Sequence, residues 1–283
     1  MMSLMHAYLR PQDADTLFTD GQWIDAMLRF ESALAQSQAE CGVIPQAAAQ
    51  AIAAACAAVQ IDHEALAQRA HCSGAMGMAI LQPLQQWLRA QRPEGLDWLH
   101  WGSTTQDVVD TAHALLTREA LQRLLAELQA LQQGLVALAE RHAATPMLAR
   151  SLMQPAQVTS FGFKCAQSAA ALQRSRMQLQ ALASQALCVQ LGGAVGNRAT
   201  LGASAAAVEQ ALARRLGLHA CGYSWHTQRD AWLRLAMEVA VCGGSLAKLA
   251  KDWSLMSQYE VGELHEAPRG STSSAMPHKR NPV

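Results

Sequence analysis

The sequence predicts an all-α protein built around a bundle of long helices. Clusters of β-branched residues, which favour strands, are nearly absent, whereas Ala, Leu and Gln are abundant. Apolar residues also recur at alternating spacings of three and four, over three stretches: residues 121–138, 158–189 and 232–256. Such a repeat is typical of a coiled-coil-like seam along which long helices pack together.

The N-terminal region, residues 1–99, is expected to form a domain of several short helices. One of these helices has an apolar face that includes Met27 and Leu34. It is expected to end near Gly42, because glycine commonly terminates helices, and Pro45 is expected to open the next helix.

Residues 100–283 are expected to form a second domain, the central long-helix bundle. Its first helix is predicted to run from about Gln106 to Arg141, roughly 50 Å at about 1.5 Å per residue. Apolar residues such as Leu125 and Leu233 lie beside the seams. The total apolar surface is therefore larger than the contacts among three helices can bury. We expect the remainder to pack against other subunits.

The composition predicts a globular protein of the cytoplasm. Of the 283 residues 51% are hydrophobic and 16% are charged, and 22 basic residues balance 22 acidic ones. No sequence-wide positive field is therefore available to recruit nucleic acid or anionic lipid. The seven cysteines lie 15 or more residues apart without a C-x-x-C pair, and neither a secretory leader nor an apolar run of about 20 residues is present. We expect free thiols and no membrane partner.

The segment HWGSTTQDVVDT, residues 100–111, is the first that suggests chemistry. Thr104 is expected to be an N-cap, and Asp107 to complete a capping box at the start of the first long helix. Hydroxyls and free N–H groups at a helix N-terminus are also suited to binding an anion such as a carboxylate. A plain helix cap is the alternative interpretation.

The segment RSLMQPA, residues 150–156, precedes the second long helix, and Pro155 is expected in the first turn of that helix. Arg150 and Gln154 have the chemistry to bind an oxyanion, or else to bridge two helices. The segment GGAVG, residues 192–196, follows a predicted helix rather than a strand and lacks a Walker lysine. It therefore predicts a tight interhelical turn rather than a phosphate loop.

The C-terminal segment combines acidic, hydroxyl and basic residues. Three acidic residues are expected to end the third long helix: Glu260, Glu263 and Glu266. Residues 268–277 are small, Ser-rich and predicted to form a mobile loop. Three potential cations then precede Asn281: His278, Lys279 and Arg280. A lid beside cations is suited to closing over a polyanion, and a disordered linker is the alternative.

Together these segments resemble, in order, the three signature regions of the fumarase/aspartase superfamily. The stretch SSAMPHKRNP, residues 273–282, is highly specific, and the pattern H-x-G-x-T-x-x-D-x-x-D-T is moderately so. The resemblance implies a homotetramer with active sites shared between subunits, and a small polycarboxylate substrate. It implies no metal or organic cofactor, and the histidines show no metal-ligand spacing. Family members continue beyond Val283, so the C-terminal helices and domain are expected to be absent from this chain.

The resemblance also implies which residues act. Ser273 corresponds to the loop serine that abstracts the proton α to a carboxylate, while Lys279 and Asn281 match carboxylate-binding residues. The other implied substrate contacts are His100, Ser103, Thr104, Thr105, Arg150, Gln154, His226, Ser274 and Met276. For His226 an alternative is a helix-start residue that packs on Trp225.

Within the family, WHTQRD at residues 225–230 and LGGA at residues 191–194 look most like the muconate cycloisomerase branch. A chemical argument supports this branch. Lyases that expel an amine or hydroxide commonly place an acidic histidine in the second region, where this chain has Leu152. A carboxylate leaving group, with a pKa of about 4, needs no such proton. The alternatives are an adenylosuccinate- or argininosuccinate-type lyase, a lyase of another weakly basic leaving group, and a non-catalytic scaffold subunit.

Overall fold

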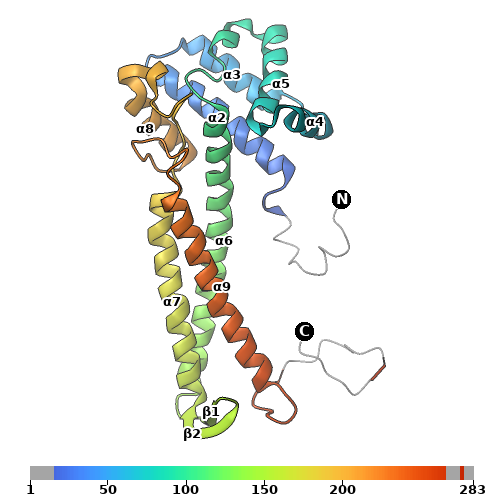
Figure 1. Ribbon diagram of the computed structural model, residues 1–283, viewed down its shortest axis with the longest axis vertical. Helices are drawn as coiled ribbons and strands as arrows, with labels where there is room; N and C mark the ends of the chain where they lie inside the picture. The colour runs from blue at the N-terminus through green and yellow to red at the C-terminus, as the bar shows by residue number, and fades with distance from the viewer. Residues whose placement is uncertain (1–15, 266–274, 277–283) are drawn as a thin grey trace. The chain divides into compact units, whose positions relative to one another are not determined.

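The computed structural model describes residues 16–265 and 275–276, and these are mostly helical (Figure 1). The all-α prediction is confirmed, with one two-stranded hairpin added. Two compact units are formed, Met1–Leu124 with Gln180–Leu235 and Leu125–Leu179 with Ala236–Val283, here called unit 1 and unit 2. The division into domains at residue 99 stays a prediction.

Three long helices correspond to the predicted seams: α6 (Thr105–Arg141), α7 (Phe161–Ala186) and α9 (Asp230–Met256). The predicted bounds of the first helix are confirmed to within one residue. Seam residues such as Leu128, Leu172 and Leu249 are buried, as the alternating spacing predicts. Two members depart from the prediction, because Val239 is exposed on α9 and Val158 lies exposed in the strand before α7. Among the described residues, no helix combines the length and apolarity that a membrane crossing requires.

The first helix of unit 1, α2 (Asp20–Glu40), begins at a side-chain cap. The hydroxyl of Thr19 accepts a hydrogen bond from the Gln22 N–H at 3.3 Å, which satisfies one of the free donors of the first turn. The helix ends just before Gly42, whose φ of 70° is in the left-handed region that favours glycine. Pro45 then precedes α3 (Gln46–Ala58), so both predicted boundaries are confirmed.

Besides parts of the long helices, unit 1 contains several further short helices and turns. They are α4 (His63–Ser73), α5 (Met76–Gln91), α8 (Ala205–Leu216) and the 3-10 turns η2 (Pro93–Trp98) and η3 (Ala199–Ser204). Helix α2 packs against α3, α5 and α8. Arg118, from α6, donates hydrogen bonds to the carbonyls of Leu216 and Gly217 at 2.6 and 2.7 Å. This contact satisfies carbonyls at the C-terminus of α8, where a cation also complements the helix dipole.

In unit 2 the structure corrects the predicted start of the second long helix. The antiparallel strands β1 (Pro146–Ser151) and β2 (Gln154–Ser160) precede α7, and Pro155 pairs with Arg150 in this hairpin rather than opening the helix. An edge strand tolerates proline, because a residue there need not donate a backbone N–H to a further strand. The two-residue turn places Leu152 and Met153 at φ of 50° and 64°, as mirror-image hairpin turns require.

The predicted end of the third long helix is also wrong. Helix α9 ends at Met256, so Glu260 and Glu263 lie beyond it, and Glu266 is outside the described residues. The hydroxyl of Ser257 donates to the Trp253 carbonyl at 2.8 Å, and the N–H of Glu263 folds back onto the Met256 carbonyl at 3.0 Å. These bonds satisfy the last carbonyls, and the helix stops there.

Gly162 allows the start of α7 to lie against the end of α6 within unit 2. A Cβ at Gly162 would lie 2.4 Å from the Ala139 carbonyl oxygen and 2.7 Å from the Ala143 Cα. We expect Gly162→Ala to lower the free energy of unfolding by about 2 kcal/mol, measured by urea denaturation. Gly134→Ala is the matched control, because nothing lies within 4 Å of its Cβ position. It should instead stabilise α6 by about 0.5 kcal/mol, and equal effects of the two variants would contradict this account.

Candidate active site

The carboxylate of Asp107 is the centre of a polar cluster in unit 1. Asp107 lies in the first turn of α6 and is fully buried. Its Oδ1 accepts a hydrogen bond from the Gly192 N–H at 2.9 Å and lies 2.7 Å from His226 Nε2. Its Oδ2 accepts from the N–H groups of Gly193 and Thr104 at 2.9 and 3.0 Å. One buried carboxylate thus joins three segments that are far apart in the sequence.

A capping box has two hydrogen bonds, and at the start of α6 the one between the Asp107 side chain and the Thr104 N–H is confirmed. Asp107 accepts from the Thr104 N–H, and the Ser103 hydroxyl lies 3.4 Å from the same carboxylate oxygen. The hydroxyls of Thr104 and Thr105 have no hydrogen-bond partner within the described part of the chain. They are therefore free to bind a ligand at this helix N-terminus, where an anion is favoured.

The interhelical connection at residues 192–196 brings its backbone against the cluster. A Cβ at Gly192 would lie 2.5 Å from His226 Cε1 and 2.5 Å from Ser224 Oγ. Gly193 has φ of 67°, a conformation that L side chains rarely adopt. A turn is present here, but it lies inside the irregular connection between α7 and η3 and is not the tight interhelical turn that was predicted. Its glycines also allow two backbone N–H groups to reach Asp107. The sequence analysis did not predict that role.

The contact with Asp107 determines the tautomer of His226. A carboxylate only accepts, so we assign the proton to Nε2, which leaves Nδ1 without a partner within the described residues. The side chain is 14% exposed. Its neighbour Trp225 stacks instead on Trp232, with ring centroids 5.6 Å apart. His226 therefore presents one ring nitrogen that can accept or donate a hydrogen bond.

A second buried network lies one turn further along α6, and the sequence analysis did not identify it. Both oxygens of Asp110 accept hydrogen bonds from Arg229, at 3.0 and 2.7 Å. Gln190 also donates to Asp110 at 3.2 Å, and its own backbone N–H donates to the Thr111 hydroxyl at 2.9 Å. Asp107, Asp110 and Thr111 are three and four residues apart and so share one helix face. That spacing is the signal from which this network could have been inferred.

His100 has an acidic partner of its own. Its Nδ1 lies 2.6 Å from Oε1 of Glu31, and its backbone φ is 63°. Burial acts to lower the pKa of His100, but the charges of Glu31 and Asp107 outweigh it and raise the pKa above the ordinary value. The imidazolium form of His100, which attracts a carboxylate, is therefore more favoured than in an ordinary histidine.

The predicted contacts from the second region lie in unit 2. Arg150 donates to both oxygens of Glu263, at 3.0 and 3.1 Å, and Gln154 is exposed at the hairpin turn. Arg150 also lines a cavity of about 530 Å³ that includes Lys164 and Asp252. Lys164 lies 2.9 Å from Asp252, so both cations of this cavity are paired. Arg150 thus bridges the hairpin to the segment after α9 rather than two helices, and its anion-binding role stays a prediction.

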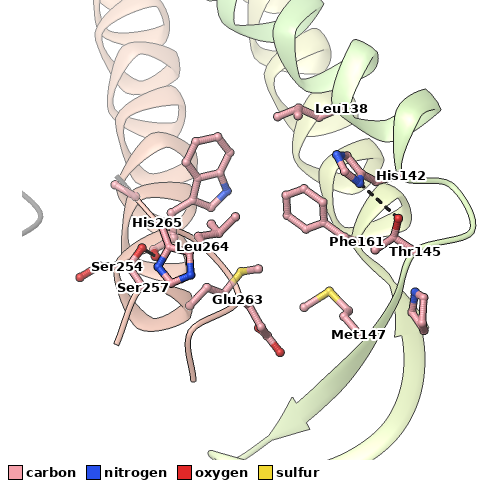
Figure 2. Close-up of a pocket in the computed structure, with 14 residues that line it drawn as sticks. Leu138, His142, Thr145, Met147, Phe161, Ser254, Ser257, Glu263, Leu264 and His265 are labelled. Atoms are coloured by element: carbon pink, nitrogen blue, oxygen red, sulfur yellow. Dashed lines mark hydrogen bonds between the residues drawn. The ribbon is translucent and has the colours of Figure 1, made fainter. Parts of the chain in front are cut away.

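A larger cavity of about 1080 Å³ in unit 2 is lined mostly by apolar side chains, including Leu138, Phe161 and Trp253 (Figure 2). None of the predicted substrate contacts that the structure describes lines it. Met276 is 42% exposed. The other signature-loop residues, Ser273, Ser274, Lys279 and Asn281, lie outside the described residues. Within the described ranges, no group of three His, Cys, Asp or Glu side chains is arranged to hold a metal ion.

The long-helix fold and the polar cluster at the start of α6 define a class of helical protein in which a buried carboxylate ties the first long helix to distant loops. A family model described as a lyase matches residues 9–283. The chain belongs to this lyase family, the fumarase/aspartase superfamily that its signature segments resemble.

Three relatives indicate where in the family this chain lies. The 3-carboxy-cis,cis-muconate cycloisomerase of Bradyrhizobium diazoefficiens is 42% identical over 93% of this chain and 59% of the relative. Trans-aconitate decarboxylase 1 of Mycosarcoma maydis is 37% identical over 94% of this chain and 54% of the relative. The solved 3-carboxy-cis,cis-muconate lactonizing enzyme from Pseudomonas putida is 38% identical, with a TM-score of 0.90, over 99% of this chain and 62% of that chain. This chain thus spans between 54% and 62% of the length of these relatives.

Asp107 should be essential to the fold of the cluster. In Asp107→Asn one oxygen becomes an NH₂ group that faces N–H donors, so we expect the free energy of unfolding to fall by roughly 3 kcal/mol in urea denaturation. Asp25→Asn is the control, because Asp25 is exposed on α2 and should change stability by less than about 0.5 kcal/mol. Wild-type stability in Asp107→Asn would show that the carboxylate does not hold the three segments together.

Proposed function

We propose that the full-length protein is a cycloisomerase that interconverts 3-carboxy-cis,cis-muconate and its carboxymuconolactone. The single observation that carries this proposal is the 42% identity, over 93% of the chain, to a relative of that name. The carboxylate-binding chemistry at the start of α6 supports it, because the substrate is a tricarboxylate. Aromatic-acid catabolism through the β-ketoadipate pathway is the corresponding metabolic role.

The proposed reaction is an intramolecular addition of a carboxylate to a double bond. A carboxylate oxygen adds to the β-carbon, so a C–O bond forms as the carbon–carbon π bond breaks. The electron pair moves into the neighbouring carboxylate and gives an aci-carboxylate. Ser273 then donates its proton to the α-carbon, and the serine regains a proton from solvent. In the reverse direction Ser273 removes that proton and the ring carboxylate leaves.

Lys279 and Asn281 are proposed to stabilise the charge that develops on the aci-carboxylate. His100, Thr104 and Thr105 are proposed to hold another carboxylate at the N-terminus of α6. The free hydroxyls and the raised pKa of His100 support this role, because both favour an anion. Ser103, Arg150, Gln154, His226, Ser274 and Met276 complete the proposed contacts.

The second region supports a leaving group that needs no acid. Leu152, at the position where other lyases place an acidic histidine, is 94% exposed at the turn of the hairpin. The ring carboxylate leaves as a stable anion, so an apolar side chain here is compatible with lactone opening. Decarboxylation of a tricarboxylate is a second candidate, favoured by the 37% identity to trans-aconitate decarboxylase 1.

The function is tested by a lactonisation assay on 3-carboxy-cis,cis-muconate with the full-length protein. We expect Ser273→Ala to lower kcat by at least about 10³-fold, because the proton donor is lost. Ser271→Ala, two residues away in the sequence and without a proposed role, should retain the wild-type rate. Release of CO₂ from trans-aconitate without lactone formation would favour the decarboxylase. Turnover by Ser273→Ala at the wild-type rate would exclude the mechanism.

We propose further that the protein is a cytoplasmic homotetramer whose subunits share active sites. Exposed apolar residues on α9 support the assembly: Leu233, Met237, Val239 and Val241. Light scattering of the full-length protein should give four times the subunit mass. Replacing Met237 and Val241 by Glu should shift the mass toward the monomer, whereas the same replacement of exposed Gln46 and Gln50 on α3 should not. A stable wild-type monomer would contradict the assembly.

A further inference from the structure

Glu31 is a carboxylate buried within the apolar face of α2. It is 1% exposed and lies beside the buried residues Met27, Phe30 and Leu34. Its Oε1 has one partner, His100 Nδ1 at 2.6 Å, and its Oε2 has none within the described residues. A buried charge with so few hydrogen bonds is costly, so a purely structural role is a poor explanation for it.

Helix α2 holds the segment around His100 at two points. Gln38, two turns beyond Glu31 and on the same face, donates to the Trp101 carbonyl at 2.6 Å. The left-handed φ of 63° at His100 is unusual for a residue with a Cβ and stores strain of about 1 kcal/mol. The contacts from Glu31 and Gln38 stabilise this conformation. They therefore determine where the imidazole points.

The pairing with Glu31 also decides which ring nitrogen remains available. Because a carboxylate only accepts, Nδ1 of His100 carries a proton, and Nε2 has no partner within the described residues. The His100 side chain is 17% exposed. Nε2 is therefore the atom that can meet a ligand.

The ionisable groups around His100 favour its charged form. They come from three helices: Glu31 on α2, Asp107 on α6 and, beside Glu31, Cys56 on α3. Burial and the charge of Glu31 raise the pKa of the Cys56 thiol, so that group stays neutral. Glu31 and Asp107 are thus the charges that act on His100, and both are negative.

We infer that Glu31 is a positioning residue that keeps His100 as an imidazolium, with Nε2–H directed to a carboxylate of the substrate. The inference rests on the proposed function for the ligand, but the geometry of the pair does not depend on it. Without Glu31, the ring of His100 more readily loses its positive charge, and no partner then fixes which nitrogen of the neutral ring keeps the proton. Substrate binding then weakens more than the chemical step.

The inference is tested with Glu31→Gln in the full-length protein. The amide keeps the size of the side chain and removes its charge. In ¹⁵N-histidine spectra, assigned with His100→Asn, we expect the His100 titration to move to lower pH. At neutral pH, KM for 3-carboxy-cis,cis-muconate should rise about tenfold while kcat changes little, because a charge-assisted hydrogen bond is lost. The pH at which KM begins to rise should move with the titration.

Glu209→Gln is the matched control, because Glu209 is equally buried and paired with Arg198. It should leave both the His100 titration and KM unchanged. An unchanged His100 titration in folded Glu31→Gln would overturn the inference. If Glu31→Gln does not fold, the wild-type spectrum alone tests the inference. A wild-type His100 that titrates at a lower pH than an ordinary histidine would contradict the pairing with Glu31.

A separate outcome distinguishes the two proposals. If the wild type neither lactonises the substrate nor binds tricarballylate, while the His100 titration moves in Glu31→Gln, the proposed function fails and the positioning of His100 stands. If the wild type turns over normally and KM is insensitive to Glu31→Gln, the inference fails and the function stands.

Discussion

The burial of the Asp107 carboxylate is the constraint on which the polar part of unit 1 depends. A carboxylate without solvent must find donors in the protein, and Asp107 finds them in three segments, at Thr104, Gly192–Gly193 and His226. Its position in the first turn of α6 adds the favourable helix dipole. The close approach of the Gly192 backbone leaves no space for a side chain, because the His226 ring occupies it. The Asp107 side chain thus ties the start of α6 to the connection that follows α7.

Two acid–histidine pairs use the same physical principle in different orientations. Asp107 accepts a hydrogen bond from Nε2–H of His226 and leaves Nδ1 available. Glu31 accepts a hydrogen bond from Nδ1–H of His100 and leaves Nε2 available. By contrast, Arg229 has both of its terminal nitrogens bound to Asp110. Around Asp107 and His100 the described residues therefore offer a ligand imidazole nitrogens and threonine hydroxyls, whereas the guanidinium of Arg229 is already paired.

These features fit α-proton chemistry on a polycarboxylate. The acidity of a C–H bond beside a carboxylate rises only when the aci-carboxylate is stabilised, so several groups must hold the carboxylates of the substrate in place. In the proposed mechanism Ser273, Lys279 and Asn281 act at the reacting carbon. In the same proposal the start of α6 holds the part of the substrate that does not react, and its binding energy serves to orient the substrate.

The sequence alone was sufficient for features that depend on local periodicity and end signals. The seams of α6, α7 and α9, the contact of Asp107 with the Thr104 N–H and the boundary at Gly42 all follow from residues within a few positions of one another. The family and its signature residues were likewise readable from short segments. Only the tertiary structure decided the hairpin around Leu152 and Met153, because strand pairing competes with helix over the same residues. It alone also decided the partners of His100 and His226, which lie 69 and 119 residues away, since the pairing of a buried charge is determined by the fold and not by its neighbours in the chain.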